Sequence, residues 1–278
     1  MKALCDEHDV IFFDLDGVIY IGPHAVQHAA DVITELRTRG IKCCFVTNNA
    51  SRTPDEVSNH LSDLGITASA DDVVTGSQAG AALMLSFVQP GARVLAVGGR
   101  GVAAALTDRG FVPVFSNDDE PQAVMQGFGP QLSWNDLAEA CYALARPIPW
   151  VATNMDSTFP TPRGLAPGNG SMVMAVAHAS GRHPDAIAGK PERSLFDEAV
   201  ARTGATRGLM VGDRLDTDIA GGNRAGMQTL LVLTGVCSAD EAAKATGDEI
   251  PCFVGTDLRS LLTEPVRWSD IQGGTHAR

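Results

Sequence analysis

The sequence has little positive charge and no long apolar run, and each absence excludes a class of function. Its 278 residues contain 21 lysines and arginines against 33 aspartates and glutamates, which gives a net charge of −12. Such an acidic chain lacks the basic surface of a protein that binds nucleic acid or an anionic membrane. No apolar run approaches a membrane span, and the opening MKALCDEHDV has no apolar signal-peptide core. We therefore expect no nucleic-acid partner and no membrane association.

Paired cysteine motifs are also missing. The six cysteines include no Cys-x-x-Cys pair. Cys43 and Cys44 lie inside an apolar run, where packing in a core is favoured over a disulfide or a zinc site. These features predict a reduced protein located in the cytoplasm. The composition is 44% hydrophobic and 19% charged, which is ordinary for a globular chain with a sizeable core.

What the sequence does contain is a regular alternation of strand and helix patterns. Apolar strand patterns at 10–13 and 41–47 alternate with helical patterns at 24–40 and 53–65, and Thr53 with Glu56 forms a capping box for the second helix. Residues 193–247 repeat this alternation. Apolar strands joined by helices predict an α/β fold with a Rossmann-like parallel sheet.

A middle block has an alternation of its own, with strand patterns at 92–97, 123–128 and 150–154 between helical segments. We predict that residues 1–79 and 185–278 form the Rossmann-like catalytic core. Residues 80–184 would then form an inserted α/β cap that determines substrate specificity. Phe111 and Phe115 in this block are expected to pack in its core.

Polar residues follow the predicted strands at the points where they end. In open parallel α/β sheets, ligands bind beyond the carboxyl ends of the strands. Clustered carboxylates there suit a hard divalent cation such as Mg²⁺, whereas lysine, hydroxyl and backbone N–H groups suit phosphoryl oxygens. Together they indicate phosphoryl transfer to an aspartate, with a second carboxylate for acid and base catalysis. These strand-end residues are Asp14, Asp16, Thr47, Asn48, Lys190, Asp213, Asp216 and Asp218.

Four of these segments resemble, in order, the four motifs of the haloacid dehalogenase superfamily. They are DLDGVIY, VTNNAS, GKP and VGDRLDTD. The segment TNMDSTFPTPRGLAPGNGS and the large insertion resemble the p-nitrophenylphosphatase and phosphoglycolate phosphatase branch, which has an α/β cap. The resemblance covers nearly the whole chain.

The resemblance implies a role for each matching residue. Asp14 matches the nucleophile and Asp16 the general acid and base. Thr47 and Asn48 match the phosphate-binding second motif, and Lys190 matches the lysine that neutralises the phosphoryl group.

The resemblance also implies a Mg²⁺ site. The metal would be held by the carboxylate of Asp14, the backbone carbonyl of Asp16 and the carboxylate of Asp213. Asp218 matches a position that more often orients the site or binds the metal through water. Asp216 has no such role, and we interpret it as part of a solvated loop.

Two other glycine-containing segments are interpreted without a ligand. Gly99-x-Gly101-x-x-Ala104, with Asp118 and Asp119 downstream, partly matches a dinucleotide fingerprint, but close packing at a strand-to-helix turn explains it equally well. The segment PGNGS at 167–171 could hold an anion at a helix N-terminus. A hinge and helix start is the favoured interpretation.

The sequence therefore predicts a Mg²⁺-dependent phosphomonoesterase that acts through an aspartyl-phosphate on a small phosphorylated metabolite. The stretches VVT to PGARVL and LAPGNGSMV look most like bacterial glycerol-3-phosphate phosphatases, so glycerol 3-phosphate is the favoured substrate. Phosphatases of 2-phosphoglycolate or nucleoside monophosphates are the alternatives. From another class, a catalytically silent sugar-phosphate-binding regulator would be expected to lack Asp14 or Lys190. Related capped phosphatases often dimerise through the cap, which makes a homodimer the corresponding expectation.

Overall fold

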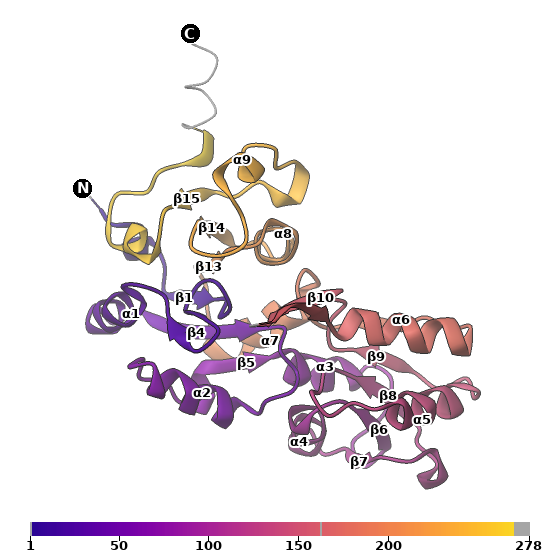
Figure 1. Ribbon diagram of the computed structural model, residues 1–278. Coiled ribbons are helices and arrows are strands. Elements are labelled where there is room, and N and C mark those ends of the chain that lie inside the picture. Colours follow the sequence, from indigo (N-terminus) through magenta and orange to yellow (C-terminus); the bar gives the residue numbers. More distant parts are fainter. Residues whose placement is uncertain (1, 162, 270–278) are drawn as a thin grey trace. The chain divides into compact units, whose positions relative to one another are not determined.

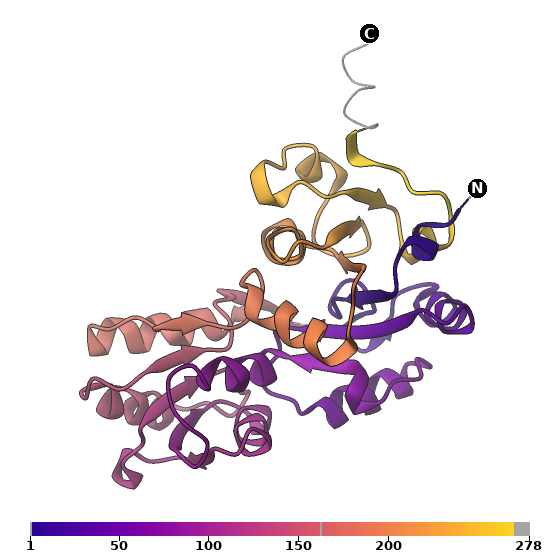
Figure 2. The same cartoon turned by 180° about the vertical axis from the view of Figure 1, so that it is seen from behind.

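A computed structural model describes residues 2–161 and 163–269 as two compact units (Figures 1 and 2). The first unit contains the chain up to Val46, then Ser58–Val73 and the chain from Ala199 onward. The second contains Thr47–Val57 and Val74–Glu198. The core and cap boundaries stated above follow the order of the motifs, and they remain a prediction.

The first unit is built on a parallel sheet with strand order β15-β14-β13-β1-β4-β5. β1 lies between β13 and β4 and pairs in parallel with both, and all four of its residues are buried. The last residue of β4 and most of β5 belong to the second unit. This topology confirms the predicted parallel α/β fold. The strands are β1 (Val10–Phe13), β4 (Lys42–Thr47), β5 (Val73–Thr75), β13 (Gly208–Gly212), β14 (Gln228–Val232) and β15 (Phe253–Gly255).

Local sequence signals account for the helices joined to this sheet. α1 buries Val32, Ile33 and Leu36 at helical spacing. Before α2, Glu56 Oε2 accepts from Thr53 N at 2.9 Å and Thr53 Oγ1 accepts from Glu56 N at 3.3 Å, which confirms the predicted capping box. The helices are α1 (Ala29–Thr38), α2 (Pro54–Asp63), α7 (Arg193–Thr203), α8 (Ala220–Arg224) and α9 (Ala239–Ala242).

The second unit has its own parallel sheet, with strand order β12-β9-β8-β6-β7. Helices α3 and α4 contribute to one apolar cluster and α5 and α6 to another, so the sheet is covered on both faces (Figure 1). The elements are α3 (Gly76–Met84), β6 (Arg93–Val97), α4 (Arg100–Asp108), β7 (Val112–Val114), β8 (Ala123–Gln126), α5 (Trp134–Leu144), β9 (Trp150–Ala152), α6 (Asn169–Ser180) and β12 (Ala186–Ile187).

One core prediction in this unit is wrong. Phe111 is 3% exposed and packs in the cluster shared by α3 and α4, as predicted. Phe115, however, is 66% exposed. It lies in the bend after β7, whose pairing with β6 stops at Val114. The sequence pattern could not show where this pairing stops.

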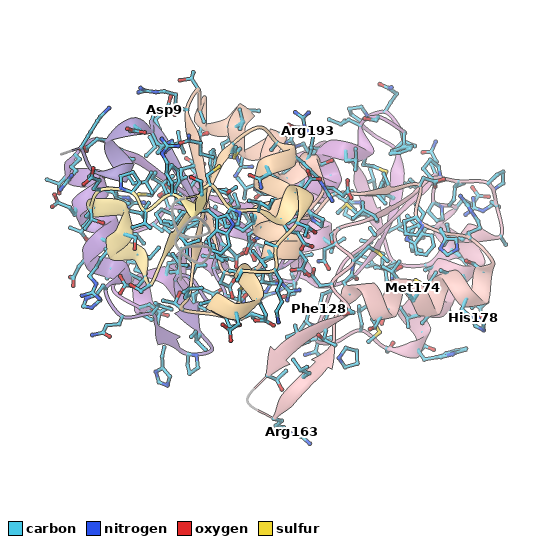
Figure 3. All side chains as sticks on the ribbon, turned by 90° about the horizontal axis from the view of Figure 1, so that it is seen from above. Asp9, Phe128, Arg163, Met174, His178 and Arg193 are labelled. Carbon is cyan, nitrogen blue, oxygen red and sulfur yellow. The ribbon has the colours of Figure 1, made fainter. Side chains whose placement is uncertain are left out.

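Two hairpins escaped the sequence analysis because their strands are too short for a periodic pattern. β2 (Tyr20–Ile21) pairs with β3 (His24–Ala25) in the first unit. β10 (Thr158–Thr161) pairs with β11 (Gly164–Pro167) in the second, with Arg163 beside the turn (Figure 3). Phe159 of this hairpin makes an edge-to-face contact with Phe128, with ring centroids 4.7 Å apart. Among the residues that the structure describes, no helix is long and apolar enough to span a membrane.

Asp9, just before β1, fixes the start of that strand and gives a testable pH dependence. Its carboxylate accepts hydrogen bonds from the Thr206 hydroxyl and from the backbone N–H groups of Thr206 and Arg207. Desolvation raises the pKa of Asp9, but these hydrogen bonds outweigh it and bring the pKa to about 2. Because the folded pKa lies below the unfolded one, the stabilisation is present above about pH 4 and is lost as the pH falls towards 2.

We therefore expect Asp9→Asn to lower the free energy of unfolding at pH 7 by about 1 kcal/mol or less, since the side chain is partly exposed. The deficit should shrink at pH 3. Urea unfolding at both values tests this, with the exposed Asp63→Asn as the matched control. A deficit that is the same at pH 7 and pH 3 would contradict the assignment.

Candidate functional site

Two neighbouring parallel strands of the first unit end in aspartates. β1 is followed by Asp14 and β13 by Asp213, and the strands pair with Phe13 opposite Val211. Asp14 N donates to Val211 O at 2.9 Å, which continues the pairing into the site. Because the strands are parallel and in register, both aspartates lie at the same edge of the sheet.

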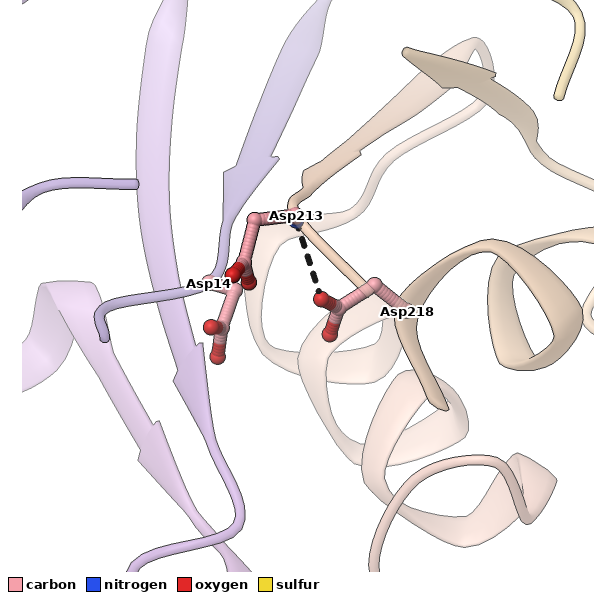
Figure 4. Close-up of side chains that lie close together, drawn as sticks. All are labelled: Asp14, Asp213 and Asp218. Carbon is pink, nitrogen blue, oxygen red and sulfur yellow. Dashed lines mark hydrogen bonds between the residues drawn. The ribbon is translucent and has the colours of Figure 1, made fainter. Parts of the chain in front are cut away.

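Asp14, Asp213 and Asp218 form a buried carboxylate cluster (Figure 4). One oxygen from each lies within 4.8 Å of the others, and the three residues are 8%, 1% and 1% exposed. Buried carboxylates are costly unless they are paired or bound to a cation. A donor set made only of oxygen fits a hard divalent cation such as Mg²⁺. The residues present therefore fit the metal that the sequence predicts.

Asp218 also fixes the backbone that carries Asp213. Its Oδ2 accepts from Asp213 N at 3.2 Å (Figure 4). It also accepts from Arg214 N at 3.1 Å. The chain reaches Asp218 through a π-helical turn at Leu215–Ile219. A Cβ on Gly212 would lie 2.1 Å from Asp218 Cβ, so this approach requires glycine. This geometry agrees with the orienting role expected for Asp218.

A loop after β14 encloses Asp213, and sequence reasoning did not assign it a role. Val236 N donates to Asp213 Oδ2 at 2.6 Å, and Thr234 Oγ1 donates to Gly17 O at 2.7 Å. Ideal Cβ atoms on Gly17 and Gly235 would lie 2.4 and 2.0 Å from Asp213 Oδ2. Gly17 also has a φ of +82°, which favours glycine. The loop thus holds the Asp213 carboxylate in one position.

The other two acidic residues that follow these strands, Asp16 and Asp216, are both exposed. Asp16 is exposed, which leaves its side chain accessible for proton transfer. Asp216 is also exposed and forms a two-point ion pair with Arg214, at 3.1 and 2.8 Å. An exposed pair of this kind contributes about 0–1 kcal/mol. The position of Asp216 agrees with its interpretation as part of a solvated loop.

The second unit holds the other three residues that the sequence assigns to the site. Thr47 and Lys190 are each 3% exposed. Asn48 Oδ1 accepts from Lys190 N at 2.8 Å, and Asn48 Nδ2 donates to Lys190 O at 3.1 Å. The Asn48 side chain therefore fixes the backbone of Lys190. The phosphate-binding roles of Thr47, Asn48 and Lys190 remain predictions.

Asn48 is the centre of a wider network whose other members were missed. Its Nδ2 lies 3.2 Å from each carboxylate oxygen of Asp156, and its carbonyl accepts from Asn154 Nδ2 at 2.8 Å. Asn169 Nδ2 in turn donates to Asn154 O at 2.8 Å. Asn154 and Asp156 follow the apolar strand β9. The strand-end rule that found Asp14 could have found them too.

The two glycine-containing segments in this unit serve packing. Ideal Cβ atoms on Gly99 and Gly101 would lie 2.7 Å from Ser51 and 2.4 Å from Arg52 O, so the start of α4 lies against the chain at 50–52. In the PGNGS segment, Gly170 N donates to Asp156 O at 2.9 Å. Both segments are closely packed, and the interpretations without a ligand remain predictions.

In the part of the chain that the structure describes, the buried cysteines and two surface hollows differ in position from the strand-end residues assigned above. Burial raises the pKa of Cys43 to about 11 and of Cys44 to about 12, in keeping with core packing. Burial, and to a smaller extent the Glu241 carboxylate, raises the pKa of Cys237.

Two hollows of about 530 and 620 Å³ contain none of the strand-end residues assigned above. The hollow of about 530 Å³ is lined by residues that include Arg93, Asn117 and Arg146. The hollow of about 620 Å³ is lined by residues that include Arg37, Cys43 and Arg202.

The first unit is thus a parallel α/β protein with an oxygen-donor site at the carboxyl ends of adjacent strands. A family model described as haloacid dehalogenase-like hydrolase matches residues 11–112, and one described as HAD-hydrolase-like matches residues 187–261. A D-glycerol 3-phosphate phosphatase of Mycobacterium tuberculosis is 48% identical over 94% of this chain and 73% of its own length. The chain belongs to the haloacid dehalogenase-like hydrolases.

Other relatives and solved structures agree with this assignment. An acid sugar phosphatase of Staphylococcus aureus is 35% identical over 93% of this chain and 98% of its own length. A glycerol phosphate phosphatase from M. tuberculosis, solved with magnesium, superposes with a TM-score of 0.90 at 48% identity, covering 94% of this chain and 79% of that one. A p-nitrophenyl phosphatase from Archaeoglobus fulgidus gives 0.83 at 27% identity, covering 92% and 98%.

Proposed function

We propose that this protein is a Mg²⁺-dependent phosphomonoesterase whose favoured substrate is glycerol 3-phosphate. The observation that carries the proposal is the buried cluster of Asp14, Asp213 and Asp218, in a chain 48% identical to a D-glycerol 3-phosphate phosphatase. The carboxylates of Asp14 and Asp213 and the carbonyl of Asp16 would hold Mg²⁺. When bound, the metal supplies positive charge opposite the phosphoryl oxygens.

The chain's own residues account for both halves of the reaction. A carboxylate oxygen of Asp14 attacks phosphorus as the bond to the leaving oxygen breaks, and exposed Asp16 gives its proton to that oxygen. Asp16 then takes a proton from water, whose oxygen attacks the phosphorus of the aspartyl-phosphate and releases inorganic phosphate. Thr47 and Lys190 bind the phosphoryl oxygens, and charge stabilisation of this kind dominates phosphoryl transfer.

The choice of substrate rests on relatives. Similarity to the D-glycerol 3-phosphate phosphatase supports glycerol 3-phosphate as the substrate, whereas similarity to the acid sugar phosphatase of S. aureus supports a sugar phosphate. Phosphatases of 2-phosphoglycolate or nucleoside monophosphates remain the alternatives. A silent sugar-phosphate-binding regulator is disfavoured because Asp14 and Lys190 are both present. The same proposal includes three further expectations. The inserted cap determines substrate specificity, two copies of the chain dimerise through that cap, and the protein is located in the cytoplasm.

Phosphate release from a substrate panel tests this function. We expect metal-dependent release from glycerol 3-phosphate, 2-phosphoglycolate, p-nitrophenyl phosphate and nucleoside monophosphates, with the highest kcat/KM on glycerol 3-phosphate. EDTA should abolish release and added Mg²⁺ should restore it. A preference for nucleoside monophosphates would favour that alternative, and activity unaffected by EDTA would contradict the mechanism.

A further inference from the structure

Thr234 is a residue that the mechanism above does not use, yet its hydroxyl is bonded to the segment that carries Asp16. Thr234 lies in the loop after β14 and is half-buried. Its Oγ1 donates to Gly17 O at 2.7 Å, across 217 positions of the chain. Both residues belong to the first unit, so this contact lies within one compact part of the molecule. The hydroxyl therefore links the loop after β14 to the residue directly after Asp16.

Gly17 is the point of this segment with the greatest backbone freedom. An ideal Cβ there would lie 2.4 Å from Asp213 Oδ2, and the φ of +82° lies in the left-handed region that favours glycine. Glycine loses more conformational freedom on folding than any other residue. The close approach of Asp213 thus requires a flexible link beside Asp16, and a contact from outside the segment restricts that flexibility.

The peptide on the amino side of Gly17 determines where the Asp16 carbonyl points. Gly17 N donates to Tyr20 O at 2.8 Å. The Asp16–Gly17 peptide is trans, so its carbonyl points away from its N–H group. The hydrogen bond to Tyr20 therefore fixes the direction of the carbonyl that is expected to bind Mg²⁺.

The peptide on the other side of Gly17 is held through both of its polar groups. Its N–H, from Val18, donates to Leu15 O at 3.3 Å, and its carbonyl, from Gly17, accepts from Thr234 Oγ1. The two peptides meet at the Cα of Gly17, so a rotation of one changes the position of the other. Of the three hydrogen bonds, the one from Thr234 comes from a distant segment.

The loop that contains Thr234 also reaches the second expected metal-binding segment, because Val236 N donates to Asp213 Oδ2 at 2.6 Å. We propose that Thr234 is a positioning residue that fixes the Asp16 carbonyl for Mg²⁺ by holding Gly17. The proposal rests on the phosphatase function proposed above. It deepens that function by naming a residue through which one loop holds both segments of the metal site.

The test measures Mg²⁺ affinity by calorimetry in the parent enzyme, in Thr234→Val and in Thr234→Ser. Valine keeps the shape of threonine but lacks the hydroxyl, whereas serine keeps the hydroxyl and lacks the methyl group. We expect Thr234→Val to weaken Mg²⁺ binding by about 10-fold or more, as residues that orient metal ligands typically do. Thr234→Ser should bind Mg²⁺ as the parent enzyme does. Excess Mg²⁺ should restore most of the phosphate release of Thr234→Val.

Thr34→Val is the matched control. Thr34 Oγ1 donates to Ala30 O at 2.8 Å on α1, so this change also removes a hydroxyl that donates to a backbone carbonyl in the first unit. Its Mg²⁺ affinity should equal that of the parent enzyme. Equal weakening in Thr34→Val and Thr234→Val would show that the effect is not specific to the site, and the proposal would be overturned.

Two other results would also overturn it. Unchanged Mg²⁺ affinity in Thr234→Val would show that the hydroxyl does not position the carbonyl, and equal weakening in Thr234→Ser would assign the effect to the methyl group. Urea unfolding shows whether Thr234→Val is folded, and if it is not, Thr234→Ala takes its place with the same expectation. A parent enzyme that binds Mg²⁺ but releases no phosphate would contradict the proposed function alone, whereas one that binds no Mg²⁺ would contradict both proposals.

Discussion

Replacing Asp14 by Asn is expected to lower phosphate release by about three orders of magnitude or more, because the neutral amide is a poor nucleophile. The change also removes one of the three carboxylates of the buried cluster. The measurement is the initial rate of phosphate release from glycerol 3-phosphate at saturating Mg²⁺. Asp216→Asn is the matched control, since Asp216 is exposed and has no assigned role.

A second readout separates loss of the nucleophile from loss of metal. Rapid acid quenching with labelled substrate should trap phosphate covalently on the parent enzyme and on Asp216→Asn, but not on Asp14→Asn. Full activity of Asp14→Asn, or covalent phosphate on that variant, would show that another residue is the nucleophile.

The second large effect is expected for Gly235→Ala. The new Cβ would lie 2.0 Å from Asp213 Oδ2 and 2.5 Å from its Cγ, so the carboxylate must move. Residues that orient metal ligands typically change affinity or activity by about 10- to 100-fold. We therefore expect Mg²⁺ affinity, measured by calorimetry, to weaken by that factor, and excess Mg²⁺ to recover part of the activity.

The control for this variant is Gly247→Ala. Gly247 has a φ of +57° and no neighbour within 4 Å of an ideal Cβ, so alanine there adds backbone strain without displacing any group. Its Mg²⁺ affinity should equal that of the parent enzyme. Equal affinity in Gly235→Ala would show that the loop after β14 does not position Asp213.

The sequence alone predicted the parts of the site that depend on local pattern. Asp14, Lys190 and Asp213 each follow an apolar strand, and a carboxylate or ammonium at such an edge is visible without coordinates. The parallel sheet itself was predicted for the same reason, because strand and helix periods alternate along the chain.

What the sequence could not supply are relations between distant segments. Gly235 has an evident role only once Asp213 is known to lie against it, and the two are 22 positions apart in the chain. The sequence predicted that Asn48 binds the phosphate. That its side-chain amide forms hydrogen bonds with the backbone of Lys190 could not be predicted, because the two residues are 142 positions apart in the chain. Phe115 was misjudged because the pairing of β7 with β6 stops at Val114, and local hydrophobicity does not encode where that pairing stops.

The pair of hydrogen bonds between Asn48 and Lys190 has a consequence for how this enzyme can be altered. The amide gives a hydrogen to the Lys190 carbonyl and receives one from its N–H, as a residue on a neighbouring β-strand would. Aspartate at position 48 would keep the acceptor and lose the donor, and threonine would be too short to span both. Both partners at position 190 are backbone groups, so a change of the Lys190 side chain leaves the two hydrogen bonds in place, whereas a change at position 48 releases the backbone that carries Lys190.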